Sequence, residues 1–220
     1  MNRASSRSDP HLSDVRASPV VALALLEAMR SADTPLETLE DEILQESLPR
    51  RLGLSDVVEG QIRRFRDLVD RKRPATARQL ADLFALVDRR DDAPVVFARA
   101  GRWLVRHEVT GGKERAGTVK LALPAALRSR MALGAARSLA EMVSPIGTIR
   151  SEKGPPAVVV EGCLPAYACG SSTGCQLITA AFARALHAFG LVDEEEHRDP
   201  VAHPMCESRG EACCIWRTVG

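Results

Sequence analysis

Residues 203–216 read HPMCESRGEACCIW and hold three of the six cysteines in a chain of 220 residues. A histidine opens this segment and a tryptophan closes it. Four explanations fit so much sulfur in one place: a metal site, a disulfide, a catalytic thiol, or a plain buried strand in which cysteine packs as a small hydrophobic residue. A metal ion would join this segment to other parts of the chain and would hold the fold together.

The spacing of the donors is compatible with a metal site. Cys206 and Cys214 are eight residues apart with Gly210 midway, which suits a hairpin whose arms bring the two thiols together. His203 lies three residues before Cys206, so an imidazole and a thiolate can reach the same ion. Cys175 lies where a loop meets a predicted helix, and the field at a helix N-terminus favours the thiolate. Three sulfurs and one nitrogen form a tetrahedral set that zinc takes in structural sites.

Spacing alone leaves the alternatives open. All six cysteines lie after residue 160, and such a cluster in a cytosolic chain more often binds metal or does redox work than forms a disulfide framework. The paired C-x-x-C motifs of zinc proteins and the cysteine spacings of ferredoxins are both absent. In the strand interpretation, one of Cys213 and Cys214 points into the core.

Helical patterns fill the first part of the chain. The first 17 residues are basic and Ser-rich and predict a disordered tail. Capping residues mark three helix starts: Thr34, Ser55, and Thr76 with Gln79 as a capping-box pair. The expected helices cover residues 18–31, 34–47, 55–73, 76–87, 93–107 and 124–142.

The pattern changes after residue 143. The runs GTIRSE (147–152) and PAVVVEG (156–162) predict two strands around a Gly-Pro-Pro turn. Residues 176–189 predict an apolar helix, and the cysteine segment alternates like a strand pair. The expected fold is α/β (α+β), with a disordered tail over residues 1–17, a helical region over 18–92 and a compact α/β domain over 93–220.

Charge and hydropathy exclude two classes of partner. The formal net charge of +1 gives no bias toward nucleic acid. A basic helix over residues 55–73 precedes TARQLADLF, but a turn led by Pro74 favours a solvated charged face over a helix-turn-helix. The most apolar run, residues 20–29, is half the roughly 20 residues of a membrane helix and contains Glu27. No signal-peptide pattern follows the N-terminus, so a cytoplasmic location is expected.

Two motifs resemble a known family. The run C-x-x-x-G-x-x-x-C-x-aromatic, filled by Cys206, Gly210, Cys214 and Trp216, resembles the end of the 4-vinyl-reductase (hydrocarbon-binding) domain. The run CQLITAAFARALHAFG (175–190) resembles that domain's element of a cysteine and an apolar helix. The family includes the sensing part of aromatic-responsive bacterial activators, archaeal hydrocarbon-binding proteins and a bacteriochlorophyll-biosynthesis protein once assigned as a 4-vinyl reductase. The resemblance covers roughly residues 95–219 and implies a zinc-stapled domain.

The resemblance implies a set of zinc ligands. By position, they are Cys175, His203, Cys206 and Cys214. In the aromatic sensors an acid lies three residues before the second cysteine, where this chain has His203. Imidazole is an equally good zinc ligand. The remaining cysteines are expected to be structural, with Cys163 and Cys169 left open as substitutes for His203.

The resemblance also implies a pocket between helices and sheet, near the zinc. Gly101 on the helix 93–107 allows close approach. The residues expected to contact a hydrophobic ligand are Phe97, Trp103, His107, Tyr167 and Phe182. Core packing is the alternative for each of them.

The expected function is a zinc-containing sensor or carrier of an aromatic or tetrapyrrole-like small molecule. The alternative is a bacteriochlorophyll-biosynthesis protein of photosynthesis, as a pigment-intermediate carrier or a component of a 4-vinyl reductase. The chain has no dinucleotide fingerprint, phosphate loop or nucleophile elbow. Whether it assists an enzyme, binds a protein partner or forms a homodimer stays open.

Overall fold

The computed structural model describes residues 11–33, 48–108, 123–153, 156–192 and 199–219. The helices are α1 (His11–Asp14), α2 (Pro19–Asp33), α3 (Leu48–Asp70), α4 (Ala77–Asp88), α5 (Ala93–Glu108), α7 (Ala125–Val143), α8 (Leu164–Cys169) and α9 (Gln176–Ala188). The strands are β1 (Arg16–Ala17), β2 (Ala75–Thr76), β3 (Thr148–Lys153), β4 (Pro156–Glu161), β5 (Val201–Met205) and β6 (Cys214–Thr218). Two short 3-10 turns, η1 (Thr173–Cys175) and η2 (Glu207–Arg209), precede α9 and β6. The expected mixture of helix and sheet is confirmed.

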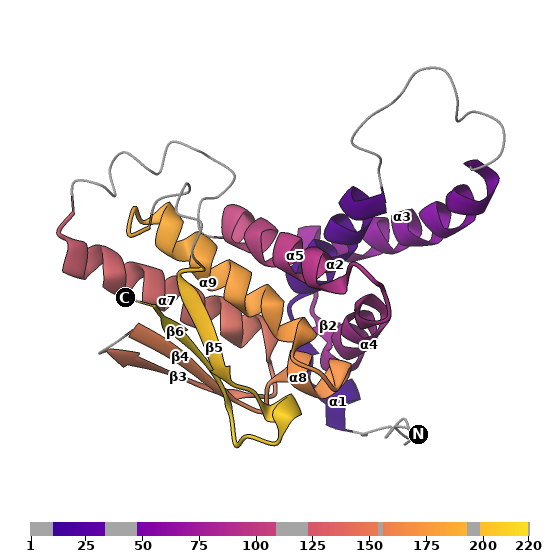
Figure 1. Ribbon diagram of the computed structural model, residues 1–220. Coiled ribbons are helices and arrows are strands. Elements are labelled where there is room, and N and C mark those ends of the chain that lie inside the picture. Colours follow the sequence, from indigo (N-terminus) through magenta and orange to yellow (C-terminus); the bar gives the residue numbers. More distant parts are fainter. Residues whose placement is uncertain (1–10, 34–47, 109–122, 154–155, 193–198, 220) are drawn as a thin grey trace.

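The larger sheet has four antiparallel strands in the order β3-β4-β6-β5. Residues 157–160 of β4 are all fully buried, which explains why this strand is a continuous apolar run instead of an alternating one. β5 is an edge strand that pairs only with β6, and its register shifts between Ala202 and Met205. Helices α7 and α9 cover one face of the sheet (Figure 1).

The N-terminal helices and the domain that contains the larger sheet share one hydrophobic core. α5 lies against α9 on one side and against α2 on the other, while α4 lies against α8 (Figure 1). Buried residues from Leu12 to Trp216 belong to one hydrophobic cluster. The boundary expected between residues 92 and 93 therefore does not separate two hydrophobic cores, because α5 contacts the helices on both sides of it.

The N-terminal segment corrects one expectation. Residues 11–17, assigned to a disordered tail, contain α1 and β1, and β1 pairs with β2 through Ala17 and Ala75. Leu12 and Ala17 are both buried, so two apolar side chains fix a segment whose composition is otherwise polar. Residues 1–10 lie outside the described part of the chain.

The helix starts are partly as expected. The capping box of Thr76 and Gln79 is present at α4, with each side chain accepting from the other residue's backbone N–H. The third helix is longer than expected, because it begins at Leu48 and not at Ser55. Pro49 lies in its first turn, where a missing N–H costs nothing, so proline starts this helix instead of ending one. The helix expected over residues 34–47 lies outside the described residues.

The remaining elements follow their sequence patterns. α2, α5, α7 and α9, the hairpin β3–β4 and the strand pair β5–β6 occur within a few residues of the expected bounds. Among the helices that the structure describes, none has the length and apolar character needed to cross a membrane.

Candidate metal centre

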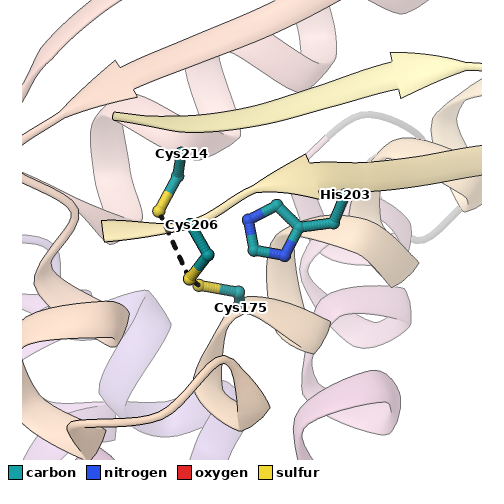
Figure 2. Close-up of side chains that lie close together, drawn as sticks. All are labelled: Cys175, His203, Cys206 and Cys214. Carbon is teal, nitrogen blue, oxygen red and sulfur yellow. Dashed lines mark hydrogen bonds between the residues drawn. The ribbon is translucent and has the colours of Figure 1, made fainter. Parts of the chain in front are cut away.

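Four side chains from three elements meet at one point (Figure 2). Cys175 ends η1 and precedes the first residue of α9, and His203 lies on the edge strand β5. Cys206 follows β5, and Cys214 is the first residue of β6. Their ligand atoms all lie within 4.8 Å of one another. The expected gathering of these four residues is confirmed.

The sulfur spacing fits a single ion. Cys175 Sγ lies 3.8 Å from Cys206 Sγ, and Cys206 Sγ lies 3.8 Å from Cys214 Sγ. A tetrahedral ion with bonds of about 2.3 Å to sulfur places its sulfur ligands about 3.8 Å apart. All three cysteines are fully buried, so a metal ion held by them would be shielded from water.

The His203 ring supplies a donor with no other partner. Its Nε2 atom is buried and has no hydrogen-bond partner in the described part of the chain. Buried polar atoms in native proteins nearly always have a partner, so an unpaired one calls for an explanation. The ring points toward the cysteine sulfurs (Figure 2), and a metal ion at the centre of the group would satisfy Nε2.

Trp216 holds the His203 ring in place. The two rings are stacked, with centroids 4.6 Å apart and planes 5° from parallel. Trp216 Nε1 donates to Thr179 Oγ1 at 3.0 Å, and Thr179 Oγ1 donates to the carbonyl of Cys175 at 3.2 Å. The imidazole on β5 is therefore tied through Trp216 to the helix that begins beside Cys175.

The turn between β5 and β6 makes hydrogen bonds with two of the sulfurs. The backbone N–H of Glu207 donates to Cys214 Sγ at 3.4 Å, and Ser208 Oγ lies 3.0 Å from Cys206 Sγ. Gly210 ends η2 with φ at 87°, a left-handed conformation that glycine adopts without strain. The sequence CESRG thus folds back so that its own N–H and hydroxyl groups lie against the sulfurs of Cys214 and Cys206.

The buried thiols strongly influence one another. Contacts with Cys163 and then Cys214, together with burial, raise the pKa of Cys175. Hydrogen bonds from Cys175 and then Cys214 lower the pKa of Cys163. These thiols compete for one buried negative charge, and a bound cation removes the competition because a coordinating thiol is deprotonated outright.

Cys163 is a further cysteine that lies beside the four candidate ligands. Its Sγ lies 4.0 Å from Cys175 Sγ, and the side chain is fully buried. Sequence reasoning left it open as a substitute for His203, and the only available signal was its position after a predicted strand. Its contact with Cys175 depends on how α8 packs, which local spacing does not reveal.

The other two cysteines lie outside the group. Cys169 Sγ lies 3.8 Å from the carbonyl of Phe84, and burial raises its pKa to about 12. Cys213 is buried beside Cys214 but does not belong to the group of four. All six cysteines are free thiols, so the disulfide alternative is not adopted in this structure.

The residues expected to contact a ligand occupy separate environments. Phe97 and Phe182 are buried in the core, and Phe97 stacks on Phe84 with ring centroids 5.5 Å apart. Trp103 and His107 stack on each other, with centroids 4.8 Å apart, near the end of α5. Tyr167 on α8 is 49% exposed.

Gly101 allows contact between helices at the place where a pocket was expected. A Cβ atom added there would lie 2.1 Å from the carbonyl oxygen of Leu177, so α5 and α9 touch backbone to backbone. This close contact leaves no room for a ligand between the two helices at that level. The placement of the ligand stays a prediction.

No family model, curated protein or solved structure matches the chain. The resemblance to the 4-vinyl-reductase family consequently rests on the motif residues alone.

Proposed function

We propose that the chain binds one zinc ion through Cys175, His203, Cys206 and Cys214, and that this ion is structural. The observation that carries the proposal is the buried, unpaired Nε2 atom of His203, beside three buried thiols spaced as a tetrahedral ion requires. Thiolate and imidazole donors in this number suit zinc better than calcium or magnesium, which take oxygen ligands.

Four protein ligands make the site structural. A catalytic zinc keeps a coordination position for water or substrate, whereas four protein donors fill the tetrahedron. The ion would join the edge strand β5, the first residue of β6 and the start of α9. It would therefore hold the sheet against the helix that covers it. Binding free energy at such a site contributes directly to folding.

The biological role follows from the motif resemblance. The domain is a sensor or carrier of a hydrophobic small molecule. Zinc fixes the position of its sheet relative to α9. Because the same family includes a bacteriochlorophyll-biosynthesis protein, tetrapyrroles are the ligands to test beside simple phenols. In the alternative role in bacteriochlorophyll biosynthesis, the chain carries a pigment intermediate or is a component of a reductase whose hydride donor is bound by another protein.

Elemental analysis of freshly reduced protein tests the metal. One zinc per chain is expected for the wild type and for Cys213→Ser, whose thiol is buried beside the site but outside it. Cys206→Ser should bind the ion more weakly than the wild type, because Cys206 Sγ lies 3.8 Å from two other ligand sulfurs. A wild-type protein that takes up no stoichiometric zinc would refute the proposal.

Thermal melts test the ligand. A tetrapyrrole or a phenol that binds the folded protein should raise the melting temperature of the zinc-loaded form in a concentration-dependent way. A homologous series of phenols and one vinyl-tetrapyrrole would be compared at matched concentration. If none shifts the melt, the sensor or carrier role fails while the zinc site stands.

A further inference from the structure

Cys163 lies against the proposed zinc ligands without being one of them. Its Sγ is 4.0 Å from Cys175 Sγ, a distance close to the 3.8 Å that separates Cys206 Sγ from the sulfurs of Cys175 and Cys214. Cys175, and after it Cys214, lower the pKa of the Cys163 thiol.

The backbone around Cys163 is firmly anchored to the site. The Glu207 carboxylate, next to Cys206, accepts from the N–H groups of Gly162 at 2.7 Å and Cys163 at 2.9 Å. The following N–H, of Leu164, donates to the buried Ser144 hydroxyl at 3.2 Å. Three consecutive backbone groups are thus bound, and two of them are bound by the turn that carries a ligand.

The Cys163 side chain is not used by its own helix. Cys163 is the N-cap residue of α8, a position where a side chain commonly accepts from the first turn, yet it makes no capping hydrogen bond. Its thiol faces the other sulfurs instead. The distance of 4.0 Å between Cys163 Sγ and Cys175 Sγ is close to the about 3.8 Å sulfur spacing of a tetrahedral ion, so this thiol can become a ligand after a local adjustment.

We propose that the metal has two alternative ligand sets, which share Cys175, Cys206 and Cys214. His203 completes the first set and Cys163 completes the second. This inference rests on the proposed function, since it assigns a further ligand to the same ion. It adds an all-sulfur mode that suits thiophilic ions, a class that includes zinc, Cu(I) and the probe ion Cd²⁺.

Charge decides which set zinc uses. Four thiolates around a divalent cation carry a net charge of −2, whereas three thiolates and a neutral imidazole carry −1. Burial penalises the higher charge, and the Glu207 carboxylate near Cys163 adds to the penalty. His203 is therefore the preferred ligand for zinc, and Cys163 replaces it when His203 is absent or when the ion is softer.

The two sets connect different parts of the fold. With His203, the ion joins the edge strand β5 to α9 and β6. With Cys163, it joins α8 to α9, the β5–β6 turn and β6, while β5 keeps its pairing with β6 and its packing on α9. Exchange of one ligand would thus move one connection of the ion from β5 to α8 without release of the ion.

The test compares four proteins: wild type, His203→Ala, Cys163→Ala and the double variant. Zinc content is measured by elemental analysis, and the number of sulfur ligands is measured by X-ray absorption on zinc-loaded and cadmium-loaded samples. Each single variant is expected to keep one ion. His203→Ala should show four sulfur ligands, Cys163→Ala should show three, and the double variant should lose stoichiometric metal.

Specific outcomes would overturn the inference. A folded His203→Ala protein that loses its metal would show that Cys163 does not substitute, and a double variant that keeps metal would show that neither residue is needed. X-ray absorption of the cadmium-loaded wild type tests the inference without a mutation. Four sulfur ligands support the inference, and three sulfur ligands with one nitrogen ligand contradict it. Wild type without metal would instead refute the zinc site itself.

Discussion

At the scale of single residues, the site depends on side chains that do not touch the ion. Trp216 is fully buried, stacks on His203 and is anchored by Thr179. Groups that orient metal ligands influence affinity because an imidazole free to rotate must lose that freedom on binding. Trp216 is therefore a positioning residue for the His203 ring.

Replacing Trp216 with Phe tests this positioning role. A phenyl ring retains part of the stacking on His203 but cannot donate to Thr179, so the zinc affinity should fall by about tenfold. Competition with a chromophoric chelator measures the change. Trp103→Phe is the matched control, since Trp103 stacks on His107, outside the site, and its zinc affinity should equal that of the wild type. Equal affinities for all three proteins would contradict the role.

At the scale of elements, the packing of α5 on α9 decides where the ligands can lie. α9 begins one residue after Cys175, so any shift of this helix along α5 moves a ligand. The helices meet at Gly101, where the carbonyl of Leu177 occupies the space of a Cβ atom. A glycine that suggests room for a ligand in the sequence instead allows the closest helix contact in this part of the core.

Gly101→Ala should therefore destabilise the protein strongly. The added methyl group would lie 2.1 Å from a backbone carbonyl that cannot move without moving α9, and overpacking of this kind costs about 1–3 kcal/mol or more. Gly134→Ala on α7 is the matched control, because no atom lies within 4 Å of its added Cβ. Removing a helical glycine there should stabilise the protein by up to about 1 kcal/mol. Urea denaturation measures the two changes, and equal effects would show that the helices separate easily at Gly101.

At the scale of the whole molecule, sequence reasoning succeeded where the relevant contacts are local. His203, Cys206 and Cys214 lie within twelve residues of chain, so their spacing already indicated a common site. The contact of Cys163 with Cys175 depends on the packing of α8, and the pairing of β1 with β2 joins segments almost sixty residues apart. Neither leaves a periodic pattern in the sequence, because each depends on tertiary contacts.

The difference between local and tertiary contacts also explains why the sequence did not reveal the environments of the residues expected to contact a ligand. Aromatic and small residues on α5 and α9 are typical of a pocket lining, but they are equally typical of a close-packed helix interface. Phe97 and Phe182 turned out to be core residues, while Tyr167 is exposed on a separate short helix. Composition cannot separate the two cases, since the distance between helices is set by single contacts such as that of Gly101 with Leu177.

If the proposed zinc is bound, removing it should lower the stability of the whole chain, because its four ligands come from β5, β6, the turn between them and the start of α9, within one hydrophobic core. The loss should be largest at alkaline pH. The raised pKa of Cys175 means that, without the ion, this thiol keeps its proton up to high pH. As the pH falls, protons compete more strongly with zinc for the thiolates, so the stability that zinc contributes decreases.

Calorimetric melts with and without a chelator, at about pH 8 and about pH 6, measure the difference in melting temperature, which should shrink at the lower pH. Adding zinc back should restore the melt and adding magnesium should not, since magnesium prefers oxygen ligands. Identical melts with and without chelator, in protein shown to have lost its zinc, would mean that the ion does not hold the fold together.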